Sequence, residues 1–351
     1  MGFKRLDAED FVVSADAVQS TAWSTGAPTL TAFYTSSTQT AGVSGNYYIS
    51  VYQTGAADTT AAVQFDIAYA DKLGSGSSYY DATYKGRTPS STTYGQYRSM
   101  ILEDENASFV TGVGSTGGTN ACGELITSST VIEMEDFWVL SPDRARYKQS
   151  LFPGTFNLTL SGSGGLLYLT DNSNDVSINT FLGSSKVYQI VSGSNGSGIS
   201  GSGGYTPDSG SYGLFFPDLA TILLNCDAIS SSIQVDSDRT ADLTNGTNQT
   251  TLYTAISGGA AFQLNSSETV TSDYIFIRAR NSEFNYSENP SFISGSTGEV
   301  IYDMFINNPQ VYPTTVGLYN DANECVAVAK LSKPLLKDFT KESLVRVKLD
   351  F

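Results

Sequence analysis

Short runs of strand-forming residues, separated by segments rich in glycine and serine, recur along most of this chain. In residues 63–69, Val, Phe, Ile and Tyr alternate with Gln, Asp and Ala, the period of a strand with one face in solvent. Residues 161–165, Ser-Gly-Ser-Gly-Gly, stand between two apolar runs and predict a hairpin. With 21 Tyr, 18 Phe and only 15% charged residues, the composition favours strands over exposed helices. We therefore expect a mainly β fold of β-sandwich-like domains, with antiparallel strands and few short helices.

The distribution of glycine and serine suggests a division of the chain. Residues 1–10 are charged and predict an N-terminal arm, and residues 11–191 would form a first β domain. Residues 192–213 are mostly Gly and Ser, which fits either a linker between domains or a long surface loop. Residues 214–351 would then form a second β domain that ends in a basic C-terminal strand.

Helix signals are few. Residues 143–149 follow Ser141-Pro142 and give the best-supported helix, because Ser and Pro favour a helix start. Residues 94–102 also fit a short helix. Residues 214–224 are apolar enough for a helix or for a buried strand, and residues 236–250 are polar and predict a loop.

The chain contains no histidine, which removes the commonest general base and metal ligand. Serine–histidine and cysteine–histidine nucleophiles and histidine-bound zinc or iron are therefore excluded. We expect a protein that is not an enzyme and that binds no cofactor or metal. Residues 196–201 match a dinucleotide-binding glycine pattern by letter, but no helix is predicted after them.

Three further patterns suggest binding or catalysis without establishing it. Asp171, Ser173 and Asp175 resemble the opening of a calcium loop, but Val176 replaces its glycine and Leu182 its closing glutamate, so a solvated Asx-turn is favoured. Acidic groups at residues 103–105 and at Glu133, Glu135 and Asp136 leave a glycosidase open, since that chemistry needs only two carboxylates. The tyrosine pairs at residues 47–48 and 79–80 could stack on sugars, although one member of a pair in a strand should face the core.

The formal net charge is −16 and the isoelectric point is near 4.3, which argues against nucleic acid and against anionic membranes as partners. The N-terminus shows no signal peptide, and the three cysteines, Cys122, Cys226 and Cys325, leave at least one thiol unpaired. These features predict folding in a reducing cytoplasm.

The C-terminal end departs from this acidic character. From residue 330 onward there are six basic and three acidic residues. The hypothesis is that this basic strand contacts an acidic neighbour during assembly. The alternative is an ordinary solvated strand pair with alternating charges. The candidate contact residues are Lys330, Lys333, Lys337, Lys341, Arg346 and Lys348.

Several segments resemble the virion structural proteins of contractile-tailed phages (myoviruses), especially cyanophages, which infect marine cyanobacteria. The resemblance is carried by residues 272–292 (SDYIFIRARNSEFNYSENPSF), 312–321 (YPTTVGLYND), 327–335 (AVAKLSKPL), 346–351 (RVKLDF) and 3–13 (FKRLDAEDFVV). Because these segments come from both ends, the likeness extends over much of the chain.

The resemblance implies a structural protein of the virion, made and folded in the host cytoplasm, with no catalytic residues to transfer. We expect an assembly subunit of the tail, in the baseplate or neck region. Its partners would be other phage virion proteins and copies of itself. The alternative is a host-surface glycan-binding adhesin or fibre-tip module.

Overall fold

The computed structural model describes residues 4–23, 34–35, 48–55, 58–81, 83, 87–112, 132–176, 180–199, 204, 210–239, 247–287 and 289–350. The chain divides into two compact units. Unit 1 comprises residues 1–17 and 269–351, and unit 2 comprises residues 18–268. Both ends of the sequence therefore belong to the same unit.

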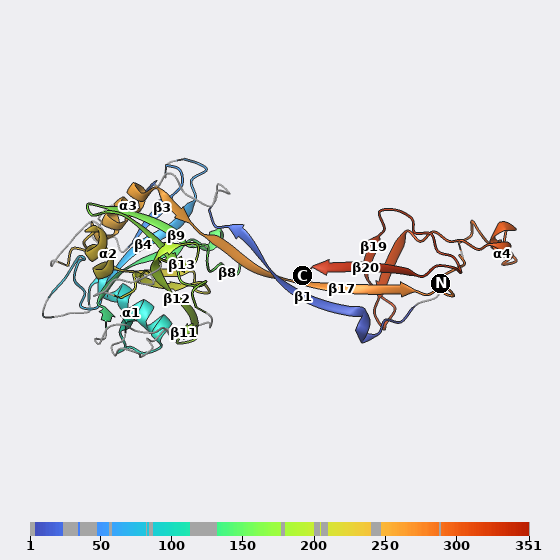
Figure 1. Ribbon diagram of the computed structural model, residues 1–351, viewed down its shortest axis with the longest axis horizontal. Helices are drawn as coiled ribbons and strands as arrows, with labels where there is room; N and C mark the ends of the chain where they lie inside the picture. Colours follow the sequence, from blue (N-terminus) through green and yellow to red (C-terminus); the bar gives the residue numbers. More distant parts are fainter. Residues whose placement is uncertain are drawn as a thin grey trace. The chain divides into compact units, whose positions relative to one another are not determined.

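Unit 2 is built on one large antiparallel sheet (Figure 1). Its strand order is β16–β9–β10–β12–β14–β15–β7–β4–β3–β2, and β11 and β13 pair with β12. The expected mainly β, antiparallel fold with few short helices is confirmed. The strands are β2 (Tyr34–Thr35), β3 (Tyr48–Tyr52), β4 (Val63–Asp71), β7 (Asp136–Pro142), β9 (Asn157–Gly162), β10 (Gly165–Asp171), β11 (Thr180–Leu182), β12 (Ser185–Ser194), β13 (Ser197–Gly198), β14 (Gly213–Phe216), β15 (Thr221–Asn225) and β16 (Ala261–Gln263).

Both faces of the central strands are buried. In β7, Trp138 and Leu140 belong to one hydrophobic cluster, while Phe137 and Val139 belong to a second cluster on the other face. The first cluster includes residues of α2 (Cys226–Ile233) and α3 (Thr247–Gly259), and the second includes residues of α1 (Pro89–Leu102). Figure 1 shows α2 and α3 together on one side of the sheet and α1 on the other. Two-sided burial explains why these strands are almost continuously apolar.

The alternation of apolar and polar residues in β4 does not place one face of this strand in solvent, as the sequence predicted. The prediction gave this strand a face in solvent, yet Gln64 and Ala70 of the second face are fully buried. The second face lies under α1, with which Ala68 and Ala70 pack in the second cluster. Gln64 and Asp71 are therefore internal polar groups, and Asp66 is half-buried.

The helices differ in part from the sequence prediction. Residues 94–102 are helical as predicted, but α1 begins earlier, because Thr88 accepts a hydrogen bond from the Ser91 amide and Pro89 takes the first helical position. The helix predicted at residues 143–149 is wrong. Only a 3-10 turn, η2 (Arg144–Arg146), forms there, and Asp143 caps it. Helix α3 begins within the predicted loop at residue 247, and residues 214–224 form the buried strand pair β14–β15.

The glycine- and serine-rich segment at residues 192–213 lies inside unit 2. Its first residues continue β12, and β13 folds back on β12 at Gly193 and Ser194. At the other end of the segment, β14 pairs with β12 as well. The segment thus connects strands of one sheet, and the units divide elsewhere. The hairpin predicted around residues 161–165 is confirmed, with Gly162 opposite Gly165.

Unit 1 is built on a small sheet. Strand β17 (Asn265–Ala279) lies between β1 (Phe11–Thr21) and β20 (Ser343–Asp350), and β17 and β20 are antiparallel. A separate hairpin pairs β18 (Thr315–Tyr319) with β19 (Cys325–Lys330) through the turn predicted at residues 319–324. The 3-10 turn η1 (Ala8–Asp10) precedes β1, and α4 (Met304–Asn307) is a single short helix. Strands β1 and β17 each contain residues of both units.

Three short strands complete the fold of unit 2. Strand β5 (Phe109–Gly112) pairs with β6 (Ile132–Met134), and Phe109 and Met134 join the second cluster. Strand β8 (Ser150–Leu151) pairs with β17 at Ser266 and Ser267.

We expect Asn248→Ala to lower the free energy of unfolding of unit 2 by about 2–3 kcal/mol, because it leaves buried backbone groups without partners. The Asn248 amide donates to the Gly76 and Asp238 carbonyl oxygens, and its Oδ1 accepts from the Asp238 amide at 2.8 Å. Denaturant unfolding would measure the loss. Thr254→Ala, at an exposed position of the same helix, is the control and should leave stability almost unchanged; equal losses would contradict the assignment.

Candidate functional site

Unit 1 buries very few apolar side chains. Of the 47 buried hydrophobic residues in the described part of the chain, only Ile275, Val311 and Val347 belong to this unit of 100 residues. Ile275 and Val347 are direct partners on one face of the β17–β20 pair. Half-buried residues such as Ile277 and Val345 extend this small core. A unit of this size normally needs a much larger core to fold alone.

Most of the large hydrophobic side chains that are exposed in the described part of the chain belong to unit 1. Sixteen of the 24 exposed large hydrophobic residues in the described part of the chain lie there. They are Phe11, Val12, Val13, Phe284, Tyr286, Val300, Ile301, Tyr302, Met304, Ile306, Tyr312, Tyr319, Val326, Val328, Phe339 and Leu344. Such a concentration of exposed apolar residues is typical of a protein-binding surface.

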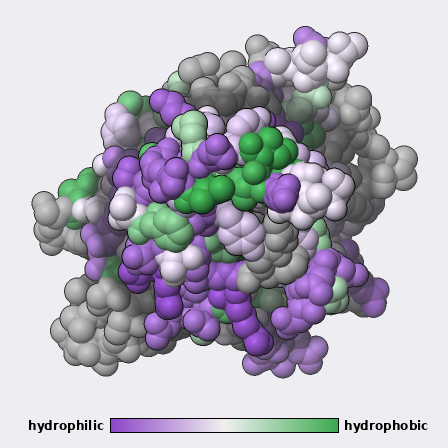
Figure 2. Space-filling view, turned by 90° about the vertical axis from the view of Figure 1, so that its right-hand side faces the viewer, coloured by the Kyte–Doolittle hydropathy of each residue, from purple (hydrophilic) through white to green (hydrophobic). Residues whose placement is uncertain are grey.

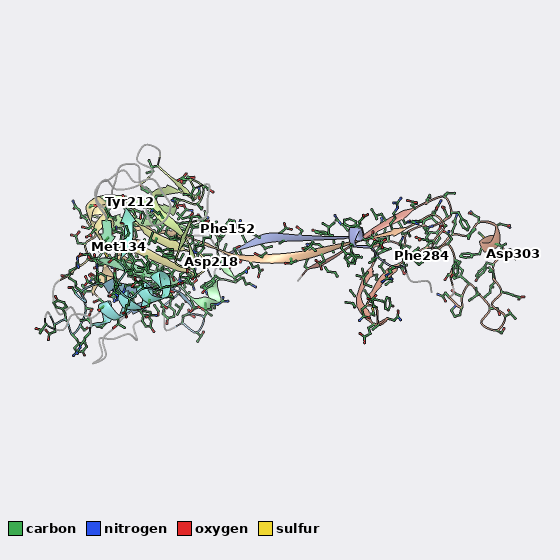
Figure 3. All side chains as sticks on the ribbon, turned by 90° about the horizontal axis from the view of Figure 1, so that it is seen from below. Met134, Phe152, Tyr212, Asp218, Phe284 and Asp303 are labelled. Carbon is green, nitrogen blue, oxygen red and sulfur yellow. The ribbon has the colours of Figure 1, made fainter. Side chains whose placement is uncertain are left out.

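The apolar residues around α4 form a continuous region with an open pocket. The space-filling view shows hydrophobic residues side by side near α4 (Figure 2). The pocket has a volume of about 260 Å³ and is lined mainly by Tyr286, Phe292, Ile293, Val300 and Phe305. The rings of Phe292 and Phe305 lie 5.2 Å apart. Figure 3 labels Phe284 and Asp303, which mark this segment between β17 and β18.

The outer face of the β17–β20 pair combines aromatic and cationic side chains. Tyr274 is opposite Lys348 and Phe276 is opposite Arg346 in the strand register. The Arg346 guanidinium lies 5.6 Å and the Lys348 ammonium 5.9 Å from the centre of the Tyr274 ring. Arg346 and Lys348 are exposed, whereas Val347 between them is buried. The predicted amphipathic strand, with its cations on one face, is confirmed.

The six predicted contact residues have different environments. Lys330, Lys333, Lys341 and Arg346 are exposed, and none of the four forms an ion pair with another described residue. Lys348 pairs with Asp350 of its own strand at 2.8 Å. Lys337 is internal.

Lys337 stabilises a loop of unit 1. Its side chain is fully buried, and its ammonium donates to the Asn281 carbonyl at 3.1 Å, to Asn285 Oδ1 at 2.7 Å and to the Asp338 carbonyl at 3.0 Å. Three acceptors satisfy the three N–H groups of the ammonium. Lys337 was a candidate contact residue, but its ammonium is buried and held by internal acceptors, so it cannot reach a partner.

A second cluster of polar side chains lies inside unit 2, at the ends of β4 and β7. Asp71 and Asp136 are direct partners across these strands, and both are buried. Asp136 accepts from the Tyr69 hydroxyl at 3.0 Å and from the Ser237 hydroxyl at 2.6 Å. Arg239 forms ion pairs with Asp71 at 2.9 Å and with Glu135 at 3.2 Å.

Burial controls the chemistry of this cluster. It raises the pKa of the Asp71 carboxyl, although the Ser75 amide and Arg239 oppose the shift. Burial and the nearby Asp136 likewise raise the pKa of the Tyr69 hydroxyl and of the Cys226 thiol. The exposed Glu133 pairs with Lys72 at 2.9 Å. The arrangement ties residues 235–239 to the sheet.

The other sequence motifs occupy turns. Asp171 is buried, and its carboxylate accepts from the amides of Gly154 and Ser173; the second bond closes an Asx-turn. The Asx-turn is as expected, but it is buried and not solvated. In the glycine pattern, Ser197 and Gly198 belong to the β12–β13 hairpin, while residues 200–201 lie outside the described residues. No group of three or more His, Cys, Asp or Glu side chains in the described residues is arranged to hold a metal ion.

The tyrosine pairs and the cysteines are dispersed. Tyr48 is exposed at the start of β3, and Tyr79 is exposed in a turn with a φ of 65°, so the strand argument does not apply to the second pair. Tyr47 lies outside the described residues. Cys226 is buried and Cys325 is exposed, and Cys122 also falls outside the described residues.

No protein-family model, no curated protein and no solved structure matches this chain.

None of the helices in the described residues has the length and apolar character needed to cross a membrane.

We expect Lys337→Met to destabilise unit 1, because it removes three charge-assisted hydrogen bonds and leaves the buried Asn285 Oδ1 without its ammonium donor. Each lost partner costs about 1–3 kcal/mol, so the loss should exceed about 2 kcal/mol. Hydrogen exchange of residues 281–285 would measure it as faster amide exchange. Lys333→Met is the matched control at an exposed position, and it should not change the exchange rates; the same acceleration in both variants would show that Lys337 has no special role.

Acidification from pH 7 to pH 5 should raise the free energy of unfolding of unit 2. Burial raises the pKa of Asp66, Asp71 and Asp171 in the folded chain. The folded chain binds these protons at a higher pH than the unfolded chain does. It therefore gains stability as the pH falls toward the unfolded pKa of 3.8. Asp66→Asn should stabilise unit 2 at pH 7 by less than about 1 kcal/mol, because solvent screens this half-buried group. Urea unfolding at both pH values would test this, and a stability loss on acidification to pH 5 would contradict it.

Proposed function

We propose that this chain is a non-enzymatic structural subunit of a virion, in the baseplate or neck of a contractile-tailed phage. In this proposal unit 1 joins the subunit to copies of itself and to other virion proteins, and unit 2 is the folded body. The virion particle would be its final location, after folding in the host cytoplasm.

The observation that carries the proposal is the contrast between the two units. Among the residues that the structure describes, unit 2 contains 44 of the 47 buried hydrophobic residues, whereas unit 1 contains three, together with two thirds of the exposed large ones. A unit with an incomplete core gains stability when a partner covers its apolar surface, so folding and association are coupled. Subunits of permanent assemblies have interfaces of this apolar kind.

The position of the resembling segments supports the same proposal. Residues 3–13 and the four segments between residues 272 and 351, which resemble cyanophage virion proteins, all belong to unit 1. The part of the chain with the resemblance is therefore the part with the exposed apolar surface.

The acidic residues of unit 2 support a structural role better than a hydrolytic one. A glycosidase needs two carboxyl groups that both reach the substrate. Asp71 and Asp136 are buried, with Arg239, Tyr69 and Ser237 as partners. The exposed Glu133 and Glu135 are in ion pairs with Lys72 and Arg239. These carboxylates stabilise the ends of strands.

Removal of residues 325–351 should abolish assembly and leave unit 2 folded. The deletion removes β19 and β20, while both hydrophobic clusters of unit 2 end at or before Leu264. Sedimentation velocity should show a monomer in place of an oligomer, with the urea-unfolding transition of unit 2 retained. Incorporation of the shortened chain into particles at the normal level would contradict the proposal.

The control for this deletion is a change of exposed apolar residues in unit 2. Leu166 and Tyr168 are both exposed on β10, and their replacement by serine should leave assembly unchanged.

A glycan array with the intact protein tests the alternative function, a glycan-binding adhesin. An assembly subunit should bind no sugar on the array, whereas an adhesin should bind one.

A further inference from the structure

The charges of unit 1 are segregated along the sequence. Residues 281–329 include six acidic and no basic residues, and residues 330–350 include six basic and three acidic ones. Both stretches belong to the same compact unit. Opposite charges on neighbouring segments would normally be expected to pair within the unit.

Among the described residues of unit 1, no ion pair joins the acidic stretch to the basic stretch. Their ion pairs join Lys4 to Glu283, Arg278 to Glu342 and Lys348 to Asp350. Glu299 and Asp303 have no cationic partner among the described residues, and Asp303 precedes α4 without capping it. Lys341 and Arg346 similarly have no carboxylate within ion-pair distance in the described part of the chain.

Two of the unpaired charges, Asp303 and Arg346, lie beside exposed apolar residues. In α4, Met304 is 81% and Ile306 67% exposed, next to the apolar pocket lined by Phe305. In β20, Leu344 is 64% exposed on the same face as Arg346. The chain thus has an acidic apolar surface around α4 (the α4 surface) and a basic apolar surface made by the outer face of β17–β20 with Lys341, two residues before β20 (the β20 surface).

We propose that the α4 surface of one copy docks on the β20 surface of the next copy of this chain. The partner is a second copy because the same unit carries both halves of the contact and leaves both unpaired. Glu299 and Asp303 would face Lys341 and Arg346, while Met304 and Ile306 would cover Leu344 and the neighbouring aromatic rings. Anionic membranes are disfavoured as the occupant of the α4 surface, because Glu299 and Asp303 repel them.

This contact has consequences for the symmetry of the assembly. It joins two different surfaces, so it is head-to-tail, and each copy uses one surface toward each of its two neighbours. Repetition of such a contact produces a closed ring or a filament. The inference rests on the proposed function and specifies how copies of the chain would meet.

Charge reversal tests the contact. Glu299→Lys with Asp303→Lys should weaken self-association more than about tenfold at low salt, and Lys341→Glu with Arg346→Glu should do the same, since like charges then face one another. A chain with all four substitutions should associate like the wild type, because every proposed pair is restored with reversed sign. Sedimentation equilibrium of the full-length chains measures each case.

The matched control is Glu103→Lys with Glu105→Lys, which makes the same charge change at exposed positions of unit 2. It should leave self-association unchanged. If the wild type assembles and neither double variant weakens it, or if the fourfold variant stays dissociated, the α4–β20 contact is wrong while the proposed function stands. If the wild-type chain is a monomer that never enters particles, both fail.

Discussion

Burial of apolar side chains on both faces of one antiparallel sheet is the constraint on which the rest of unit 2 depends. Strands β4, β7, β14 and β15 send alternate residues into two separate hydrophobic clusters, so helices must cover both sides. This arrangement places polar groups such as Asp71 and Asp136 in the interior, where they need fixed partners. Arg239, Tyr69 and Ser237 supply those partners and hold the chain after α2 against the sheet.

Unit 1, in contrast to unit 2, buries few apolar side chains. Its β17–β20 pair has one small buried face around Ile275 and Val347, and an outer face of aromatic and cationic side chains. The hairpin β18–β19 also exposes Val326 and Val328. A two-stranded hairpin has little stability alone, and strands of this kind are stabilised when another layer packs on them. An assembly of several copies would provide that layer, which connects the proposed function directly to the energetics of the fold.

Individual basic residues near the C-terminus show how tertiary structure separates roles that look alike in the sequence. Lys333 and Lys337 both follow β19 within a few residues, yet Lys333 is exposed and Lys337 has three internal acceptors. The backbone carbonyls of Asn281 and Asp338 are two of those acceptors, and no sequence motif indicates where a carbonyl will point. Lys348 pairs with Asp350, whereas Arg346 lies over the Tyr274 ring and forms no ion pair with another described residue.

Local sequence was sufficient for the mainly β fold, for the hairpin at Gly162–Gly165 and for the alternation of Arg346 and Lys348 with Val347, because turn chemistry and strand period are properties of neighbouring residues. Local sequence did not predict the start of α3, because this polar helix is held in place by the packing of Leu252 and Ile256. It also predicted a helix at residues 143–149, where the chain forms only one 3-10 turn. The units were also beyond local reasoning. Residues 1–17 and 269–351 form one unit because β17 pairs with strands from both ends of the chain, and strand pairing over such distances leaves no trace in any local window.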